Sequence, residues 1–204
     1  MQDELNNDDG VLRCPWAGDH NDYRAYHDQE WGRPVVDDVP LFEKLCLEGF
    51  QAGLSWLTIL RKREAFRVAF ADFNPEVVAG FGPTEVEGLL TNPGIVRNRA
   101  KVVSTINNAT RALGVAKEHG SLAAYLWSFE PVNRSWESGG SIPSQTPDSK
   151  ALAHDLKRRG WTFVGPTTVY AFMQAVGMVN DHLPHCAVRS SVEEQRAKLS
   201  RPVL

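Results

Sequence analysis

Four side chains that can bind a metal lie near the two ends of this chain. Cys14 and His27 lie near its start, and His182 and Cys186 lie near its end. Three residues separate the second pair, a spacing that suits two ligands presented by one turn. Thiolate and imidazole together form a ligand set that tetrahedral zinc accepts readily. A zinc ion bound to all four would tie the N-terminal region to the C-terminal region.

The spacing alone leaves this metal site undecided. The chain has three cysteines and six histidines, so some pairs will resemble ligands by chance, and each of the two spacings is permissive. His185 is a rival ligand beside Cys186. Cys46 suits a core position better, because it has apolar neighbours on a helical pattern and free cysteine is often buried.

Glu48 occupies an unusual position on a predicted helix. The helix that begins near Leu41 buries Leu41 and Leu45, and position 48 continues the same stripe. A carboxylate there faces the core or a cavity, and burying it unpaired would cost roughly several kcal/mol. Trp56 follows closely, so the acid and the indole could hold a planar, electron-poor heterocycle. The alternative is a salt bridge from Glu48 to an Arg or Lys across the core.

A second aromatic group surrounds His27 in the N-terminal region. Tyr23 and Tyr26 lie one helical turn apart and can line one wall, where a buried tyrosine hydroxyl needs a partner. Trp16 and Trp31 flank them. Aromatic residues at this density more often form a core than a site. If His27 binds the metal, it connects this wall to the metal.

The segments that must position these side chains are mostly helical. Apolar residues recur at three- and four-residue spacing, and proline, serine and glycine mark the helix ends. The segment 161–164 is strand-like but too short to build a sheet, and 133–147 is predicted to be a long loop. The sequence therefore predicts an all-α fold. The predicted helices cover about 40–52, 55–70, 97–117, 149–159 and 167–178, with two short ones after Asn74 and Gly82.

Length and composition predict one domain with short tails. The chain has 204 residues, 42% of them hydrophobic, and its net charge of −3 argues mildly against a nucleic-acid binder. We expect a disordered acidic tail over 1–12, a domain over 13–188 and a flexible C-terminal tail over 189–204. No apolar run is long enough for a membrane span. The polar N-terminus is not a secretory signal, so a cytoplasmic, reducing location is expected.

A tight turn between two helices, near 89–101, is a candidate for contact with DNA. Pro93 and Gly94 form the turn, and Arg97, Arg99 and Lys101 follow it. In a helix-hairpin-helix, such a turn aims backbone N–H groups and a helix N-terminus at a DNA phosphate. The turn lacks the second glycine of the fuller pattern, so an ordinary connector between packed helices is the alternative.

Three long motifs resemble the DNA-3-methyladenine glycosylase I family. The first contains Arg-Cys-Pro-Trp at 13–16 and Tyr-His-Asp-Gln-Glu-Trp-Gly at 26–32. The second is Leu-Glu-Gly-Phe-Gln-Ala-Gly-Leu-Ser-Trp at 47–56. The third combines Phe-Val-Gly at 163–165, Phe-Met-Gln-Ala at 172–175 and Asn-Asp-His at 180–182. The similarity covers the chain from about Arg13 to Cys186.

This resemblance implies a helix-hairpin-helix DNA glycosylase fold and a monomer. It implies hydrolysis of the N-glycosidic bond of 3-methyladenine in double-stranded DNA, with release of free 3-methyladenine, an abasic product and no lyase activity. Because this family lacks the catalytic aspartate typical of its superfamily, Asp181 is given no such role. The implied site residues are Cys14, His27, His182 and Cys186 for structural zinc; Glu48, Tyr23, Tyr26 and Trp56 around the base; and Leu54 in the DNA stack. We expect Glu48 to be the catalytic group, and we expect the hairpin to bring Gly94, Arg97, Arg99 and Lys101 to the DNA backbone.

The expected chemistry follows from the charge of the damaged base. Methylation at N3 makes the adenine cationic and a good leaving group, so no strong acid is needed. We expect an ionised Glu48 to recognise its N–H edge while Trp56 stacks on the ring. Two other classes remain: a zinc hydrolase, which would have three protein ligands and a water, and a non-enzymatic binding module, which would leave Glu48 unexplained.

Overall fold

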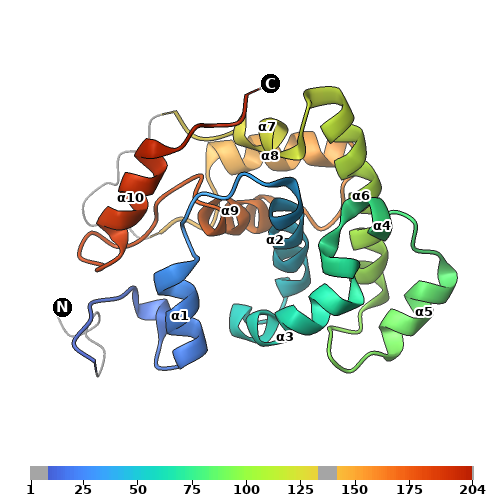
Figure 1. Cartoon of the computed structure of the whole chain (residues 1–204), viewed down its shortest axis with the longest axis horizontal. Coiled ribbons are helices and arrows are strands. Elements are labelled where there is room, and N and C mark those ends of the chain that lie inside the picture. The colour runs from blue at the N-terminus through green and yellow to red at the C-terminus, as the bar shows by residue number, and fades with distance from the viewer. Residues whose placement is uncertain (1–8, 133–141, 204) are drawn as a thin grey trace.

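The computed structural model describes residues 9–132 and 142–203, and these form helices and connecting turns with no strand. The all-α prediction is therefore confirmed for the described residues (Figure 1). The expected loop over 133–147 and the expected tail over 1–12 fall partly outside them. The helices are η1 (Pro15–Ala17), α1 (Asn21–Gln29), α2 (Asp38–Gln51), α3 (Trp56–Ala69), η2 (Ala71–Phe73), α4 (Pro75–Val78), α5 (Pro83–Thr91), α6 (Arg99–His119), α7 (Leu122–Trp127), α8 (Pro147–Arg158), α9 (Pro166–Ala175) and α10 (Arg189–Lys198).

Helix α2 lies at the centre of the molecule and contacts α3, α6, α7 and α9 (Figure 1). Every residue from Leu41 to Phe50 is buried. Because α2 is covered on all sides, its polar side chains at Glu43, Lys44 and Glu48 are buried with the apolar ones. Each of these charges must therefore be paired, neutralised or directed into a cavity.

A short turn over residues 52–55 separates α2 from α3. Gly53 has φ +80°, a conformation that other L-residues rarely adopt. Ser55 then caps α3, as predicted, because its Oγ accepts a hydrogen bond from the Thr58 N–H at 3.2 Å. This sharp 52–55 turn holds Leu54 outward, with 43% of its surface exposed.

A second turn, over residues 92–98, joins α5 to α6 at the lower edge of Figure 1, close to α3. The side chain of Asn98 caps α6 by accepting the Lys101 N–H at 3.1 Å. A Cβ atom on Gly94 would lie 2.9 Å from the Cβ of Ala65 on α3. Glycine at position 94 therefore allows the 92–98 turn to pack directly on α3.

The N- and C-terminal regions of the domain meet, and residues 189–198 of the expected C-terminal tail form a helix. Residues Arg189–Lys198 form α10, which lies on the same side of the molecule as α1 (Figure 1). Val192 anchors this helix in the core. Arg201 beyond it donates to the Glu130 carboxylate at 2.6 Å. The backbone N–H of Ala187 also donates to the Leu12 carbonyl at 2.8 Å.

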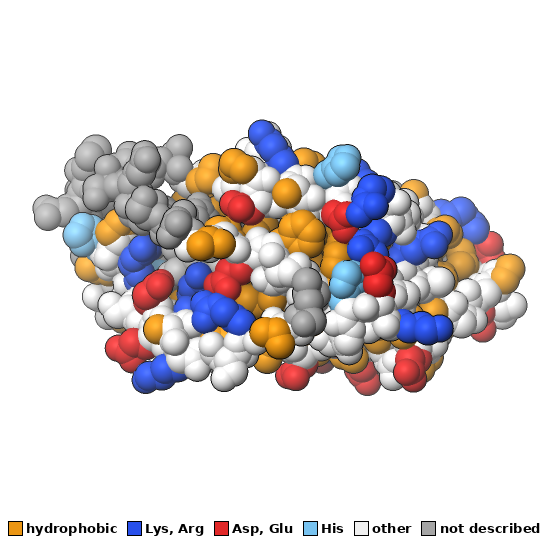
Figure 2. All heavy atoms as spheres, turned by 90° about the horizontal axis from the view of Figure 1, so that it is seen from above, with side chains coloured by type: hydrophobic (Ala, Val, Ile, Leu, Met, Phe, Trp, Pro, Cys, Tyr) orange, Lys and Arg blue, Asp and Glu red, His pale blue; other side chains and the backbone are white. Residues whose placement is uncertain are grey.

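The surface charge is mixed, and none of the described helices is both long and apolar enough to cross a membrane. Figure 2 shows basic and acidic side chains interspersed on the face opposite α3. No extended area of one sign is visible on that face. The face therefore shows no electrostatic footprint for a polyanion.

Candidate active site and metal centre

An aromatic cavity of about 240 Å³ lies between α1, the end of α2, the start of α3 and α9. This volume is smaller than the roughly 300–1,000 Å³ of a drug-sized pocket, so it suits a single heterocycle. The sequence predicted four of the lining residues as a site: Tyr23, Tyr26, Glu48 and Trp56. The other lining residues are Trp16, Trp31, Gln51, Ile142, Ala171 and Gln174.

Glu48 brings a buried carboxyl group to this cavity. Its exposed fraction is 5%, and its Oε2 atom has no hydrogen-bond partner among the described residues. The alternative of a core salt bridge is not realised, because the nearby Lys44 ammonium donates to Glu30 instead. Burial raises the pKa of Glu48 to about 8, opposed only in part by the charge of Lys44. The raised pKa favours the neutral form in the protein by itself, whereas an ionised Glu48 was expected.

Trp56 and Tyr26 form the aromatic wall that faces Glu48. Their ring centroids lie 5.4 Å apart at an interplanar angle of 42°. Trp56 is the first residue of α3, and its buried Nε1 atom also has no partner among the described residues. An unpaired carboxyl oxygen and an unpaired indole N–H in one small cavity are unusual in a folded protein, where buried polar groups are normally paired. Both residues line the cavity, and neither of these two atoms has a partner among the described residues.

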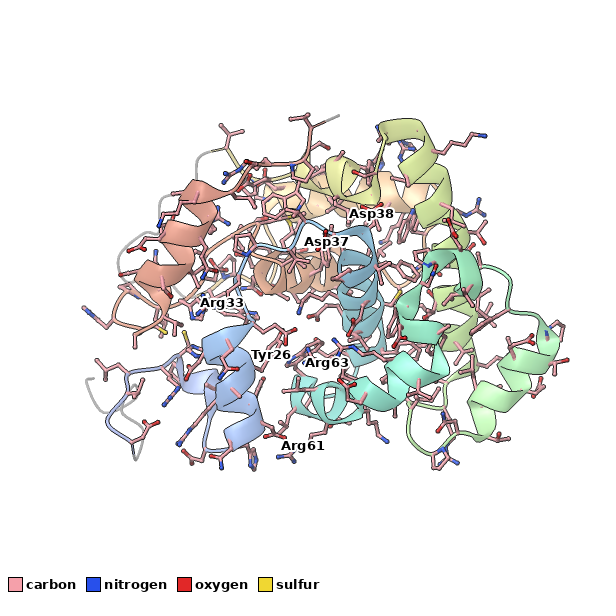
Figure 3. All side chains as sticks on the ribbon, in the orientation of Figure 1. Tyr26, Arg33, Asp37, Asp38, Arg61 and Arg63 are labelled. Atoms are coloured by element: carbon pink, nitrogen blue, oxygen red, sulfur yellow. The ribbon has the colours of Figure 1, made fainter. Side chains whose placement is uncertain are left out.

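The aromatic wall is supported from behind by a charged network between α1 and α3. Glu30 accepts hydrogen bonds from Arg63 at 2.6 and 2.7 Å and also from Lys44. The Lys44 ammonium lies 5.5 Å from the centre of the Tyr26 ring. Figure 3 shows Tyr26 on α1 and Arg63 on α3 reaching into the space between the two helices. This network restricts the position of Tyr26 at the cavity.

The four predicted metal ligands come together in the structure. Cys14, His27, His182 and Cys186 are all buried, and their ligand atoms lie within 4.8 Å of one another. The His27 Nε2 and His182 Nδ1 atoms are 3.2 Å apart, and the Cys186 sulfur lies 3.5 and 3.4 Å from them. A tetrahedral zinc with ordinary bond lengths requires roughly 3.3 Å between nitrogens and roughly 3.5 Å between nitrogen and sulfur. The group therefore fits such a metal.

Neighbouring groups orient both imidazoles toward the centre of this group. The His27 Nδ1 atom lies 2.7 Å from the Asp28 carboxylate, which Arg13 also binds at 2.9 Å. The His182 Nε2 atom lies 3.1 Å from the carbonyl oxygen of Trp31. Such partners fix the ring position of a metal-binding histidine. Because Trp31 also lines the cavity, the metal group and the cavity share a wall.

The four residues predicted on the DNA backbone have different environments. Arg97 is exposed and has no ion pair in the described parts of the chain, whereas Arg99 pairs with Glu87 at 2.7 Å. The Gly94 N–H already donates to the Asn92 side chain at 2.8 Å.

The prediction that Lys101 contacts the DNA backbone is wrong. Its side chain is 8% exposed, and its ammonium donates to two backbone carbonyls at the end of α2. Lys101 is therefore not available to a phosphate.

Six lining residues were not predicted as a site, and four of these have polar or aromatic side chains. Trp16 and Trp31 were noticed only as part of an aromatic group, and Gln51 and Gln174 carried no signal beyond lying within the family motifs. Asp181 lies outside this cavity. It accepts hydrogen bonds from Tyr170 at 2.5 Å and Gln174 at 2.8 Å.

A larger cavity of about 520 Å³ lies beside α7 and α10. Its charged groups are engaged with one another, since Glu130 binds both Arg196 and Arg201. It contains none of the predicted base-binding residues, so it is a weaker candidate for the site.

Comparison with known proteins agrees with the geometry. Residues 16–190 match the model of the methyladenine glycosylase family. The chain is 44% identical to DNA-3-methyladenine glycosylase of Haemophilus influenzae over 89% of this chain and 100% of the relative. It is also 44% identical to DNA-3-methyladenine glycosylase 1 of Escherichia coli, over 85% of this chain and 95% of the relative.

Solved structures match over the same region. A crystal structure of 3-methyladenine DNA glycosylase I superimposes with a TM-score of 0.81 at 46% identity, covering 86% of this chain and 98% of the other. The Staphylococcus aureus enzyme, solved to explain 3-methyladenine recognition, gives 0.83 at 35% identity, covering 91% and 97%. This chain belongs to the methyladenine glycosylase family.

Proposed function

We propose that this protein removes 3-methyladenine from alkylated DNA by hydrolysing the N-glycosidic bond, as the first step of base-excision repair. The observation that carries this proposal is the buried Glu48 carboxyl group with an unpaired oxygen in a cavity walled by Tyr26 and Trp56. Membership of the family supports it, as does a relative of 37% identity whose crystal structure was solved in complex with 3-methyladenine.

The geometry of the cavity requires the base to leave the double helix. A base stacked in duplex DNA cannot reach into a cavity of the protein, so the nucleotide must be flipped out at a cost of roughly a few kcal/mol. Leu54 projects from the 52–55 turn beside Trp56 and can fill the gap left in the stack. Stacking of the base on an aromatic ring offsets about 1–3 kcal/mol of the cost.

Recognition of the damaged base depends on the protonation of Glu48. Because its pKa is raised to about 8, the carboxyl is mostly neutral at pH 7. A cationic N3-methylated adenine favours the ionised form, so entry of this base displaces the proton. Neutral adenine offers no such compensation for a buried charge. Glu48 thereby selects the cation and favours a positively charged ring as the glycosidic bond breaks.

The absence of lyase activity is consistent with the groups at the cavity. A lyase step needs an amine that attacks the sugar, and none of the lining residues carries one. In this scheme water attacks the sugar and an intact abasic site remains.

The metal that we assign to the Cys14, His27, His182 and Cys186 group is structural zinc. When bound, it supplies cross-links between distant parts of the chain and not Lewis-acid catalysis, because four protein ligands leave no open position. The residues themselves hold α1, with Tyr23 and Tyr26, against the body of the domain. A zinc hydrolase is disfavoured for the same reason.

Binding to double-stranded DNA is assigned to the side that carries the 52–55 and 92–98 turns. Arg97 is exposed there, and Arg99 can exchange its partner Glu87 for a phosphate. The 92–98 turn and its flanking helices would act as the hairpin of a helix-hairpin-helix. Its backbone N–H groups would contact phosphate once Gly94 releases Asn92. We assign these contacts to a monomer.

The decisive experiment is incubation of the protein with methylated duplex DNA, followed by chromatography of the released bases. We expect free 3-methyladenine and abasic, unbroken strands. Binding of the DNA without release of any base would contradict the enzymatic proposal and favour a binding module. Replacement of Glu48 by Gln should sharply reduce release in single-turnover assays, because Gln cannot carry the charge that the cationic base requires.

A further inference from the structure

A lysine from α6 holds the end of α2. The Lys101 ammonium donates hydrogen bonds to the carbonyl oxygens of Phe50 at 2.8 Å and Ala52 at 2.6 Å. These oxygens lie where α2 ends and the 52–55 turn begins, immediately before the exposed Leu54. Burial lowers the pKa of Lys101, so the side chain is held at this position against a desolvation cost.

A lysine from α3 makes the reverse connection. The Lys62 ammonium donates to the carbonyl oxygens of Pro93 at 3.1 Å and Gly94 at 3.2 Å, within the 92–98 turn. Helix α6 therefore holds backbone oxygens at the turn that precedes α3, and α3 holds backbone oxygens of the turn that precedes α6. Because Gly94 also packs directly on α3, the two turns are fixed relative to each other.

The charge of Lys101 has a second consequence. Carbonyl oxygens at the C-terminus of a helix carry partial negative charge, which is unfavourable beside a DNA phosphate. The Lys101 ammonium neutralises this end of α2, next to the side chain that would enter the DNA. Both the position of the 52–55 turn and the charge around it thus depend on Lys101, which follows the 92–98 turn in the sequence.

We propose that Lys101 is a positioning residue for base flipping. It holds the 52–55 turn so that contact of the 92–98 turn with the phosphates sets the depth at which Leu54 enters the stack. Lys62 maintains the same spacing from the other side. This inference rests on the role proposed above for Leu54 and on the proposed glycosylase activity.

The test compares duplex and single-stranded DNA, because only the duplex must be opened. Lys101→Met keeps the length of the side chain and removes the charge. We expect single-turnover release of 3-methyladenine from duplex to fall about tenfold, the effect of losing hydrogen bonds from a charged donor. Release from single strands and binding of free 3-methyladenine, followed by tryptophan fluorescence, should change by less than about twofold. Lys117→Met, on the exposed part of α6, is the matched control.

A double-mutant cycle distinguishes the role proposed for Lys101 from the role proposed for Leu54, on which it rests. Leu54→Ala alone should also lower release from duplex, and Lys101→Met should add nothing in the Leu54→Ala background if it acts through Leu54. If Leu54→Ala has no effect on duplex, the proposed role of Leu54 is wrong and the inference falls with it. Two outcomes would overturn only the inference about Lys101, provided that Leu54→Ala itself lowers release from duplex. One is that the loss of release caused by Lys101→Met adds fully to that of Leu54→Ala. The other is that Lys101→Met lowers release equally from duplex and single-stranded DNA.

Lys62→Met provides a second variant if Lys101→Met does not fold. Its hydrogen bonds are longer and the side chain is only partly buried, so we expect a smaller loss of about threefold on duplex alone. An equal loss on single-stranded DNA would contradict the proposal.

Discussion

At the residue scale, the protein places one carboxyl group where its ionisation is unfavourable. Glu48 lies on the buried stripe of α2, and the surrounding aromatic groups give it no hydrogen bond to Oε2 among the described residues. The free-energy cost of burying an ionised Glu48 is the basis of selectivity for the cationic base, because only a cationic ligand compensates the charge. Two predictions follow from the raised pKa, one for activity and one for stability.

Activity on methylated duplex DNA should rise with pH between 6 and 8. The substrate base carries a fixed charge, whereas the ionised fraction of Glu48 increases about tenfold per pH unit below a pKa of about 8. Single-turnover release at subsaturating enzyme, which reports the ionisation of the free protein, should therefore increase over this range and level off above it. The Glu48→Gln variant should show a low and flat profile. A flat profile for the unaltered protein would mean that Glu48 is already ionised at pH 6.

Stability should change in the opposite direction. The folded protein raises the pKa of Glu48 from 4.5 to about 8, so folding favours the protonated form. Its contribution is most favourable below the unfolded pKa and is lost as pH rises through the folded pKa. At pH 9, Glu48→Gln should therefore increase the free energy of unfolding by on the order of a few kcal/mol and raise the melting temperature. At pH 5 it should have little effect on either quantity. The exposed Glu194→Gln is the control; an equal gain at both pH values would contradict the argument.

The sequence predicted the carboxyl group of the site better than the other residues that line the cavity. Glu48 was visible because a carboxylate on an apolar helical stripe conflicts with the periodicity. Trp16 and Trp31 could not be separated from core residues, because a cavity wall and a core have the same composition. Gln51 and Gln174 could not be found, because their role depends on the approach of α2 to α9 in three dimensions.

At the element scale, the two turns depend on close approach between helices. The 92–98 turn packs on α3 only because position 94 lacks a side chain. Helix boundaries with local signals were predicted well: Ser55 caps α3, and prolines open α4 and α5. Helix α10 was missed because it is polar, and the burial of Val192 is a tertiary contact without periodic pattern.

Gly94→Ala should destabilise the protein by about 1–3 kcal/mol, the usual cost of overpacking. The new Cβ would lie 2.9 Å from the Cβ of Ala65 and 3.0 Å from Oδ1 of Asn92. Urea denaturation measures the change. Gly88→Ala is the matched control, because nothing lies within 4 Å of its Cβ position on α5, and it should stabilise by up to about 1 kcal/mol. Equal effects at the two glycines would contradict a specific contact.

At the scale of the whole molecule, the metal group connects regions that are far apart in sequence. Cys14 and His182 are separated by 168 positions, and their ligand atoms lie 3.7 Å apart. The proposed zinc would therefore stabilise the arrangement of α1 against the domain. Chemistry at Glu48 would depend on it only through that arrangement.

Removal of the metal should lower stability before it lowers the rate of base release. We expect one zinc per chain by atomic absorption, and loss of this zinc with a strong chelator or in Cys186→Ser. The melting temperature should fall in both cases, because binding free energy at a structural site is folding free energy. Release of 3-methyladenine measured well below the new melting temperature should be largely retained. Full loss of activity with an unchanged melting temperature would instead indicate catalytic zinc.

The separation of Cys14 from His182 and Cys186 also sets an order of events during synthesis of the chain. Helix α1, with Tyr23 and Tyr26, leaves the ribosome early, but the groups that secure it are made only near the end. Until then α1 is held by its contacts with α3 and by the Glu30 network, without the metal group. A chain released before residue 186 would carry a complete α2 and Glu48 but no anchored aromatic wall. The protein therefore acquires its base pocket late in translation, and a truncated product would be a target for proteolysis.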